Sequence, residues 1–184
     1  MKTEILVVDN FYEDPSGIRA FALQQSFSVE GTYFPGYRTI PHLTDEAKTK
    51  LNSLLTAIDK PVTSWHNDRS TGAFQISTDG NSGWVHYDVD CDWAAVCYLT
   101  PNAPIDTGTS LYRHAEYHDR YMLNTLYDPY NQAIWEEVDR IGNVFNRLVL
   151  YKSSMFHRAT RYFGKTIYNG RLFQVFFINT RTDE

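Results

Sequence analysis

Hydrophobic and polar residues alternate with two different periods along the chain, which divides it into a helical part and a strand-rich part. Apolar side chains recur every three to four residues over about 15–27 and again over 44–58. This spacing gives a helix one buried face. We therefore expect one domain spanning 1–184, with a helical N-terminal part over about 1–60 and a β-barrel core over about 61–180.

The start of each predicted helix is marked by a residue that caps helices well. Asp14 precedes Pro15, so a carboxylate can accept hydrogen bonds from the first free amides, and proline occupies the first helical position. Thr44 offers a hydroxyl cap before the second helix. These residues predict helices that begin at about Pro15 and directly after Thr44.

Short apolar and aromatic runs, typical of buried strands, account for most of the remaining chain. The predicted strands are Glu4–Val8, Ala73–Ser77, Trp93–Thr100, Arg147–Tyr151 and Arg171–Ile178. Asn169-Gly170, a strong hairpin signal, precedes the last of them. The fold class predicted is α+β and mainly β: a double-stranded β-helix of the jelly-roll or cupin-like type, with the N-terminal helices packed on one sheet.

Two segments predict connections between these elements. Gly31–His42 is rich in glycine, proline and aromatic residues and predicts a loop. Ala103–Arg140 predicts a long tyrosine-rich connection that ends in a helix from Pro129 to Ile141. The helix is expected because Ile134, Trp135 and Val138 follow a helical spacing.

Composition and charge exclude several classes of protein. The 184 residues carry a net charge of −5 and contain no run of basic residues, so nucleic acid is not an expected partner. The apolar run at the N-terminus is too short for a signal peptide, and no stretch is long enough to span a membrane. Cys91 and Cys97 do not form a disulfide framework, which suits a reducing compartment. We expect a cytoplasmic protein.

The residues with the clearest chemistry are His86, Asp88 and His157. His86 and Asp88 are two residues apart, so on a strand both side chains point to one face, and His157 follows sixty-nine residues after Asp88. Two imidazoles and one carboxylate are the ligands that hold non-haem Fe(II) with open coordination positions. A second pair with the same spacing, His66 and Asp68, is less favoured, because His86 stands between two predicted strands, Ala73–Ser77 and Trp93–Thr100.

Arg171 follows His157 by fourteen residues and opens the last predicted strand. A guanidinium in this position can bind a ligand carboxylate through two parallel hydrogen bonds. Arg158 and Arg161 lie near the same strand and compete for this assignment. The residues together predict iron and a dicarboxylate cosubstrate.

The sequence around these residues resembles the 2-oxoglutarate/Fe(II)-dependent dioxygenases, and within them the prolyl-hydroxylase-like branch. The similar segments are Trp84–Asp88, Val96–Thr100, Gly108–Leu111, Met155–His157 and Arg171–Phe177. Two N-terminal segments, Asp9–Pro15 and Phe34–Thr39, also resemble a small group of such oxygenases, many from microbes and phages. The resemblance extends over roughly residues 5–180.

This resemblance implies a role for each candidate residue. His86, Asp88 and His157 would bind Fe(II), and Arg171 would pair with the distal carboxylate of 2-oxoglutarate. Tyr98 lies where relatives often place a hydroxyl on the same carboxylate. The implied reaction uses O2 and 2-oxoglutarate to hydroxylate a substrate. Two alternatives stay open: a cupin-type metal enzyme that uses no 2-oxoglutarate, and a non-catalytic jelly-roll binding module.

The substrate is expected to contact two aromatic segments, Tyr33–Thr39 and Gly108–Tyr127. The candidate contact residues are Arg38, Tyr112, Arg113 and His114. Such a rim suits an anionic or amino-acid-like metabolite or a peptide. Loops longer than about 12–15 residues within a domain are uncommon and are usually functional. We therefore expect Ala103–Tyr127 to govern substrate choice and to close over the iron.

One further histidine pair has a spacing that metal sites use. His114 and His118 are four residues apart, so on a helix they would share a face. The intervening glutamate is at the wrong offset for a zinc protease. We interpret the pair as part of the border of the long connection.

Overall fold

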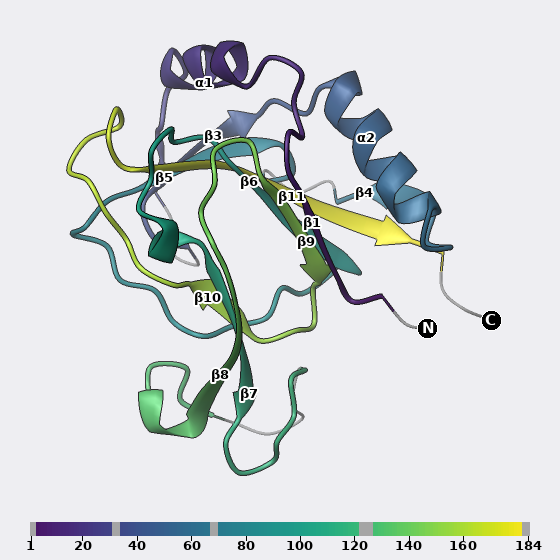
Figure 1. Cartoon of the computed structure of the whole chain (residues 1–184), viewed down its shortest axis with the longest axis vertical. Helices are drawn as coiled ribbons and strands as arrows, with labels where there is room; N and C mark the ends of the chain where they lie inside the picture. The colour runs from purple at the N-terminus through teal and green to yellow at the C-terminus, as the bar shows by residue number, and fades with distance from the viewer. Residues whose placement is uncertain (1–2, 31–33, 67–69, 122–126, 182–184) are drawn as a thin grey trace.

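Two antiparallel sheets and two helices form the framework of the fold (Figure 1). The computed structural model describes residues 3–30, 34–66, 70–121 and 127–181. The predicted fold class is confirmed, because the sheets form a double-stranded β-helix and the helices pack on the larger sheet. Within the part of the chain that is described, no helix has the length and apolar character needed to cross a membrane.

The larger sheet has eight strands and is built around its longest one, β11. Its strands are β1 (Ile5–Val8), β2 (Val29–Glu30), β3 (Tyr37–Pro41), β4 (Val62–Trp65), β5 (Ala73–Ser77), β6 (Trp93–Tyr98), β9 (Leu148–Lys152) and β11 (Arg171–Thr180). Their order is β1-β9-β6-β11-β5-β3-β2, and β4 also pairs with β11. Strand β11 therefore has β6 along one edge and β5 followed by β4 along the other.

The smaller sheet has three strands in the order β10-β7-β8. They are β7 (Thr109–His114), β8 (Trp135–Ile141) and β10 (His157–Ala159). Two short 3-10 helices, η1 (Ile105–Thr107) and η2 (Gln132–Ile134), precede β7 and β8. The pairing of β10 with β7 sets His157 opposite Leu111, so the smaller sheet carries one of the candidate metal ligands.

Both helices begin where the sequence predicts. Helix α1 (Pro15–Leu23) is capped by Asp14, whose side chain accepts a hydrogen bond from the Gly17 amide at 2.8 Å. Helix α2 (Asp45–Thr56) is capped by the Thr44 hydroxyl. Helix α1 ends at Leu23, before the predicted end at about Phe27. Buried residues of both helices pack against one face of the larger sheet.

Strand alternation decides which side chains face the helices and which face the interior between the two sheets. On β6, Trp93, Ala95 and Cys97 pack with the helices, whereas their neighbours Ala94, Val96 and Tyr98 belong to the interior cluster. The period of two in a strand produces this division. The interior cluster includes Leu111 and Met155, from β7 and the turn before β10, so this face of the larger sheet points toward the smaller one.

Two sequence-based expectations about connections are wrong. The segment expected as a helix from Pro129 to Ile141 holds η2 followed by strand β8, which pairs with β7. The long connection from Ala103 to Arg140 therefore contains a β-hairpin, and the expected Gly31–His42 loop contains β3. The helical spacing around Trp135 misled the prediction, because non-local pairing with a neighbouring strand overrides a local pattern of this kind.

Candidate metal centre

Backbone hydrogen bonds fix the positions of His86, Asp88 and His157. The His86 amide donates to the His157 carbonyl at 3.0 Å, and the His157 amide donates to the His86 carbonyl at 2.7 Å. Two residues further on, the Asp88 amide donates to the Ser153 carbonyl at 2.8 Å. The extended segment that carries the first two residues therefore lies directly beside β10, which carries the third.

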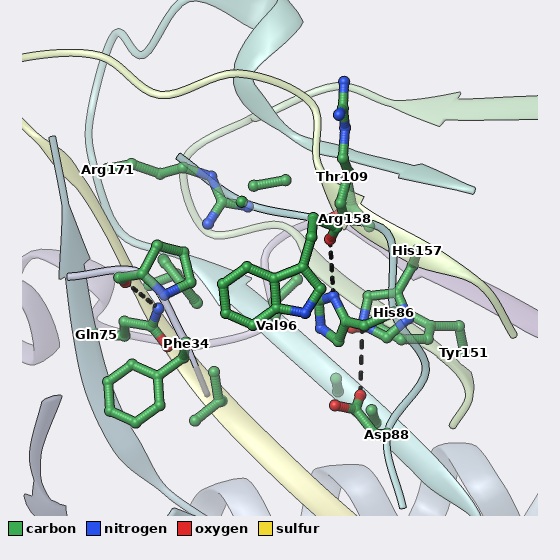
Figure 2. A pocket seen from close by; sticks show the side chains of 18 of the residues that line it. Phe34, Gln75, His86, Asp88, Val96, Thr109, Tyr151, His157, Arg158 and Arg171 are labelled. Atoms are coloured by element: carbon green, nitrogen blue, oxygen red, sulfur yellow. Dashed lines mark hydrogen bonds and ion pairs between the residues drawn. The ribbon is translucent and has the colours of Figure 1, made fainter. Parts of the chain in front are cut away.

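The three side chains converge on one point. One ligand atom from each of them lies within 4.8 Å of the others. The His157 Nε2 is 3.4 Å from an Asp88 carboxylate oxygen, and the two imidazole rings are 4.4 Å apart between centroids. Figure 2 shows the two imidazoles side by side with the Asp88 carboxylate below them. The predicted grouping of these three residues is confirmed.

Each imidazole is oriented by a backbone carbonyl. The Nδ1 of His86 is 3.0 Å from the Trp84 carbonyl oxygen, and the Nδ1 of His157 is 2.9 Å from the Met155 carbonyl oxygen. A carbonyl oxygen can only accept, so both Nδ1 atoms carry the proton. The Nε2 atoms then keep their lone pairs for a metal ion, and the carbonyls hold the rings in the required orientation.

The protonation state of the site also suits a metal ion. Burial, and then the proximity of His86, lowers the pKa of His157 from 6.5 to about 4. This imidazole is therefore neutral at pH 7, which metal coordination requires. Two imidazoles and a carboxylate fit Fe(II), because this donor set holds the ion on one side and leaves its other positions open.

The triad opens onto a cavity between the two sheets, and Arg171 lies away from the triad in its wall (Figure 2). The Arg171 side chain is only 3% exposed. Its Nε donates to the Thr107 carbonyl at 2.8 Å and one terminal nitrogen donates to the Gly108 carbonyl at 3.1 Å. No carboxylate among the described residues pairs with it. A buried charge without a counter-ion is costly, so this guanidinium is suited to an anionic ligand.

Tyr98 and Thr109 form a hydroxyl pair beside Arg171. Their oxygens are 2.6 Å apart, and the Arg171 guanidinium lies 5.3 Å from the centre of the Tyr98 ring. Thr109 lines the cavity, and Tyr98 is fully buried behind it. Tyr98 was predicted from the sequence, whereas Thr109 was not. Had a strand been predicted over the segment Gly108–Leu111, which resembles dioxygenases, the alternation of side chains would have placed Thr109 on its inner face.

Tyr151 is a second residue of the cavity that the sequence analysis missed. It lies on β9, lines the cavity, and has its ring centroid 4.6 Å from that of His157. Burial and then the negative charge of Asp88 raise the pKa of its phenol well above the usual value. The signal that could have found it is its inward position on the predicted strand ending at Tyr151.

Arg38 is the one predicted substrate contact that the structure places in the cavity wall. Its guanidinium lies 3.8 Å over the Phe34 ring, and its Nε donates to the Gln75 side chain at 2.7 Å. Arg38 and Phe34 border both the cavity and an adjoining outer hollow. Together with Trp84 and Phe177 they form what we call the mouth of the cavity.

The other three predicted substrate contacts are not among the residues that line the cavity. Tyr112 packs in a separate cluster with Trp135 and Phe156. Arg113 forms an ion pair of 2.6 Å with Glu136 across the β7–β8 hairpin. His114 is buried between Trp135 and Tyr117, which is stacked on it. Their contact with a substrate stays a prediction that this placement does not support.

The positions of the alternative candidates favour Arg171 over Arg158 and Arg161 as the anion-binding residue, and His86 with Asp88 over His66 with Asp68 as metal ligands. Arg158 also lines the cavity, but its side chain extends away from the triad in Figure 2 and donates to the Gln132 side chain at 2.9 Å. Arg161 is exposed and pairs with Asp106 at 2.8 Å. His66 borders the outer hollow, and Asp68 lies outside the described residues. Among the described residues the only group that could hold a metal ion is His86, Asp88 and His157.

Solved structures with the same fold come from several organisms. The chain is similar to HygX from Streptomyces hygroscopicus, solved with nickel, 2-oxoglutarate and hygromycin B bound, at 14% identity and a TM-score of 0.61, covering 96% of this chain and 83% of that one. It is also similar to a prolyl hydroxylase from Trichoplax adhaerens, solved with a peptide fragment of the hypoxia inducible factor oxygen degradation domain. That match has 14% identity and a TM-score of 0.55, and covers 96% and 84% of the two chains.

A Pseudomonas putida prolyl-4-hydroxylase is similar at 15% identity and a TM-score of 0.51, covering 97% and 94% of the two chains. Identities this low establish the fold alone. Comparison with curated proteins finds no match. A family model, described as a family of unknown function (DUF6445), matches residues 1–134, which include His86 and Asp88. The chain thus belongs to this family, and its fold, as the sequence predicts, is that of the 2-oxoglutarate/Fe(II)-dependent dioxygenases, including the prolyl hydroxylases.

Proposed function

We propose that the protein is an Fe(II)- and 2-oxoglutarate-dependent oxygenase that hydroxylates an amino acid, a peptide or a small anionic metabolite. One observation carries the proposal: a set of metal ligands and a buried guanidinium without a carboxylate partner face the same cavity. The first requires a cation and the second an anion. A metal ion and an acid that bridges to Arg171 would satisfy both.

In this proposal His86, Asp88 and His157 hold the iron. When bound, Fe(II) together with 2-oxoglutarate and O2 supplies the oxidising power for hydroxylation. The protein contributes ligand geometry, since the Trp84 and Met155 carbonyls fix the two imidazoles before the metal arrives. It also keeps His157 neutral through burial, so no proton has to leave this ligand at pH 7.

Arg171 would bind the distal carboxylate of 2-oxoglutarate. Its two hydrogen bonds to backbone carbonyls hold the guanidinium in place without neutralising its charge. The Thr109 hydroxyl lines the cavity beside it and can donate to the same carboxylate, while the Tyr98 hydroxyl behind it donates to the Thr109 oxygen. Apolar side chains complete the wall and exclude water from the space between the anchor and the triad, among them Val96, Phe173 and Val175.

The substrate would enter at the mouth, where Arg38 lies over Phe34. Structures with this fold hold ligands as different as a peptide fragment and hygromycin B, which supports a mouth that admits either a peptide or a small molecule. Arg38 favours an anionic or amino-acid-like group at this point. The two free cysteines are consistent with a reducing compartment, and we propose that the enzyme acts in the cytoplasm.

The experiment that tests the proposed function is anaerobic addition of Fe(II) and then 2-oxoglutarate. We expect a weak visible charge-transfer band on the second addition, and succinate on exposure to air. A cupin-type enzyme that uses no 2-oxoglutarate would bind iron without the band. A binding module would bind neither, and either result would overturn the proposal.

A further inference from the structure

The Tyr151 hydroxyl is neither a metal ligand nor part of the Arg171 anchor. The residue is 3% exposed, and what remains accessible belongs to the cavity that it lines. No hydrogen bond joins its hydroxyl to any other described residue, and no dashed line reaches it in Figure 2. Buried polar groups are nearly always paired, so a hydroxyl of this kind is suited to a ligand atom.

The position of Tyr151 assigns it to the triad end of the cavity. Strand register sets Tyr151 opposite Ala94 and sets Tyr98 opposite Phe173. Ala94 and Tyr98 are four residues apart on β6, so the backbone positions of Tyr151 and Tyr98 are separated by roughly 13 Å along the strand direction. Tyr98 reaches toward Arg171, whereas the Tyr151 ring packs against His157.

A bridging ligand between Arg171 and the triad must present oxygen atoms at both ends. In the proposed function the distal carboxylate meets Arg171, and the 2-oxo and first carboxylate groups lie at the triad. A phenol with an ordinary pKa near 10 is protonated at neutral pH and can donate to either of these groups. At the triad end, Tyr151 offers this donor on the side of the larger sheet.

We propose that the Tyr151 hydroxyl donates a hydrogen bond to the 2-oxo acid end of the cosubstrate, so that the protein holds this molecule at both ends. The inference rests on the proposed function and extends it to a residue that is neither a metal ligand nor part of the Arg171 anchor. Tyr151 then contributes to the choice of a 2-oxo acid, and Arg171 contributes to the choice of a second carboxylate.

The test uses two ligands that differ only at the distal end. Wild-type protein, Tyr151→Phe and Arg171→Gln are loaded with nickel, the metal present with 2-oxoglutarate in the HygX structure, and titrated by calorimetry. The ligands are 2-oxoglutarate and 2-oxovalerate, which lacks the distal carboxylate. We expect Tyr151→Phe to weaken both ligands by a similar factor of about ten. Arg171→Gln should weaken 2-oxoglutarate alone.

Phenylalanine keeps the ring that packs on His157, so the nickel affinity and the thermal midpoint of Tyr151→Phe should match the wild type. Tyr12→Phe is the matched control, because its buried hydroxyl bonds to Gln174 on the helix-facing side of the larger sheet. Unchanged affinity of Tyr151→Phe for both ligands, or loss confined to 2-oxoglutarate, would overturn the inference. A changed nickel affinity would also overturn it, since Tyr151 would then act on the metal site. If nickel-loaded wild type binds neither ligand, the proposed function itself fails, and this inference with it.

Discussion

The cavity and the β7–β8 hairpin both contain arginines, but the two regions satisfy them differently. On the hairpin Arg113, Arg120 and Arg140 each pair with a carboxylate of the same protein at 2.6–2.7 Å. In the cavity Arg171, although far more buried, donates to two backbone carbonyls and pairs with no carboxylate of the described residues. These three hairpin arginines are therefore neutralised within the protein, whereas the Arg171 guanidinium is placed to pair with an anionic ligand.

This difference separates a structural surface from a binding site on physical grounds. Exposed ion pairs contribute about 0–1 kcal/mol, so those of the hairpin are nearly neutral for stability. A buried cation without a counter-ion costs several kcal/mol, and selection for stability alone would remove it. Two tyrosines differ in the same way: the Tyr112 hydroxyl donates to Glu137 at 3.4 Å, whereas that of Tyr151 has no hydrogen-bond partner among the described residues.

The largest expected effect comes from removing a ligand of the metal centre. We expect His157→Ala to weaken Fe(II) binding at least about a hundredfold, because the two remaining side chains cannot complete the facial set. Equilibrium titration with a chromophoric chelator measures this, and circular dichroism checks that the domain stays folded. His66→Ala is the control, since His66 borders only the outer hollow. Loss of iron in His66→Ala with retention in His86→Ala would contradict the assignment.

The next effect concerns the buried guanidinium. Arg171→Gln should lower the affinity for 2-oxoglutarate by about 2–5 kcal/mol, because the distal carboxylate would be buried without its charged partner. Iron affinity should stay the same, since Arg171 is not a metal ligand. The anaerobic charge-transfer band gives both quantities in one titration. Arg161→Gln is the matched control, an exposed arginine paired with Asp106. An equal loss of 2-oxoglutarate affinity in the two variants would show that Arg171 does not bind the distal carboxylate.

A smaller effect is expected on the pH dependence of stability without metal. The folded protein holds the pKa of His157 at about 4, below the ordinary 6.5. As the pH falls below 6.5 the unfolded chain takes up a proton that the folded protein refuses until about pH 4. Folding is therefore destabilised progressively over this window, by roughly 3 kcal/mol in all. Urea unfolding between pH 7.5 and 4 measures it, and His157→Gln should show a weaker decline. If the free energy of unfolding falls equally with pH in wild type and His157→Gln, titration of His157 is not the cause of the decline.

How much the sequence predicts depends on whether the signal is local. The helix starts at Asp14 and Thr44 and the buried strand from Trp93 follow from neighbouring residues, and the structure matches them. The hairpin was missed because β8 is defined by its pairing with β7, whereas its own residues also fit a helical spacing. Strand β3 was missed for a similar reason, since its pairing with β5 lies outside the segment itself.

The candidate site shows the same limit. His86, Asp88 and His157 could be identified because spacing and flanking strands bring them together, and their convergence is confirmed. Thr109 and Tyr151 were missed: an inward position on a strand narrows the candidates, but a threonine or tyrosine there has no distinctive pattern until the opposite wall of the cavity is known. Conversely, Arg113 and His114 looked functional only because β7 was taken for a loop.

The smallest expected effect therefore belongs to Arg113, and it sharpens the comparison between hairpin and cavity. Arg113→Ala breaks an ion pair with Glu136 in which the two side chains are 42% and 45% accessible. The free energy of unfolding should therefore fall by less than about 1 kcal/mol. Formation of succinate from 2-oxoglutarate should be unchanged, with or without a substrate that stimulates it. Arg38→Gln is the contrasting variant, because Arg38 lies at the mouth, and it should lower only the substrate-stimulated rate. If Arg113→Ala instead lowers the substrate-stimulated rate and spares the unstimulated one, the β7–β8 hairpin contacts the substrate. The hairpin would then belong to the binding site together with the cavity.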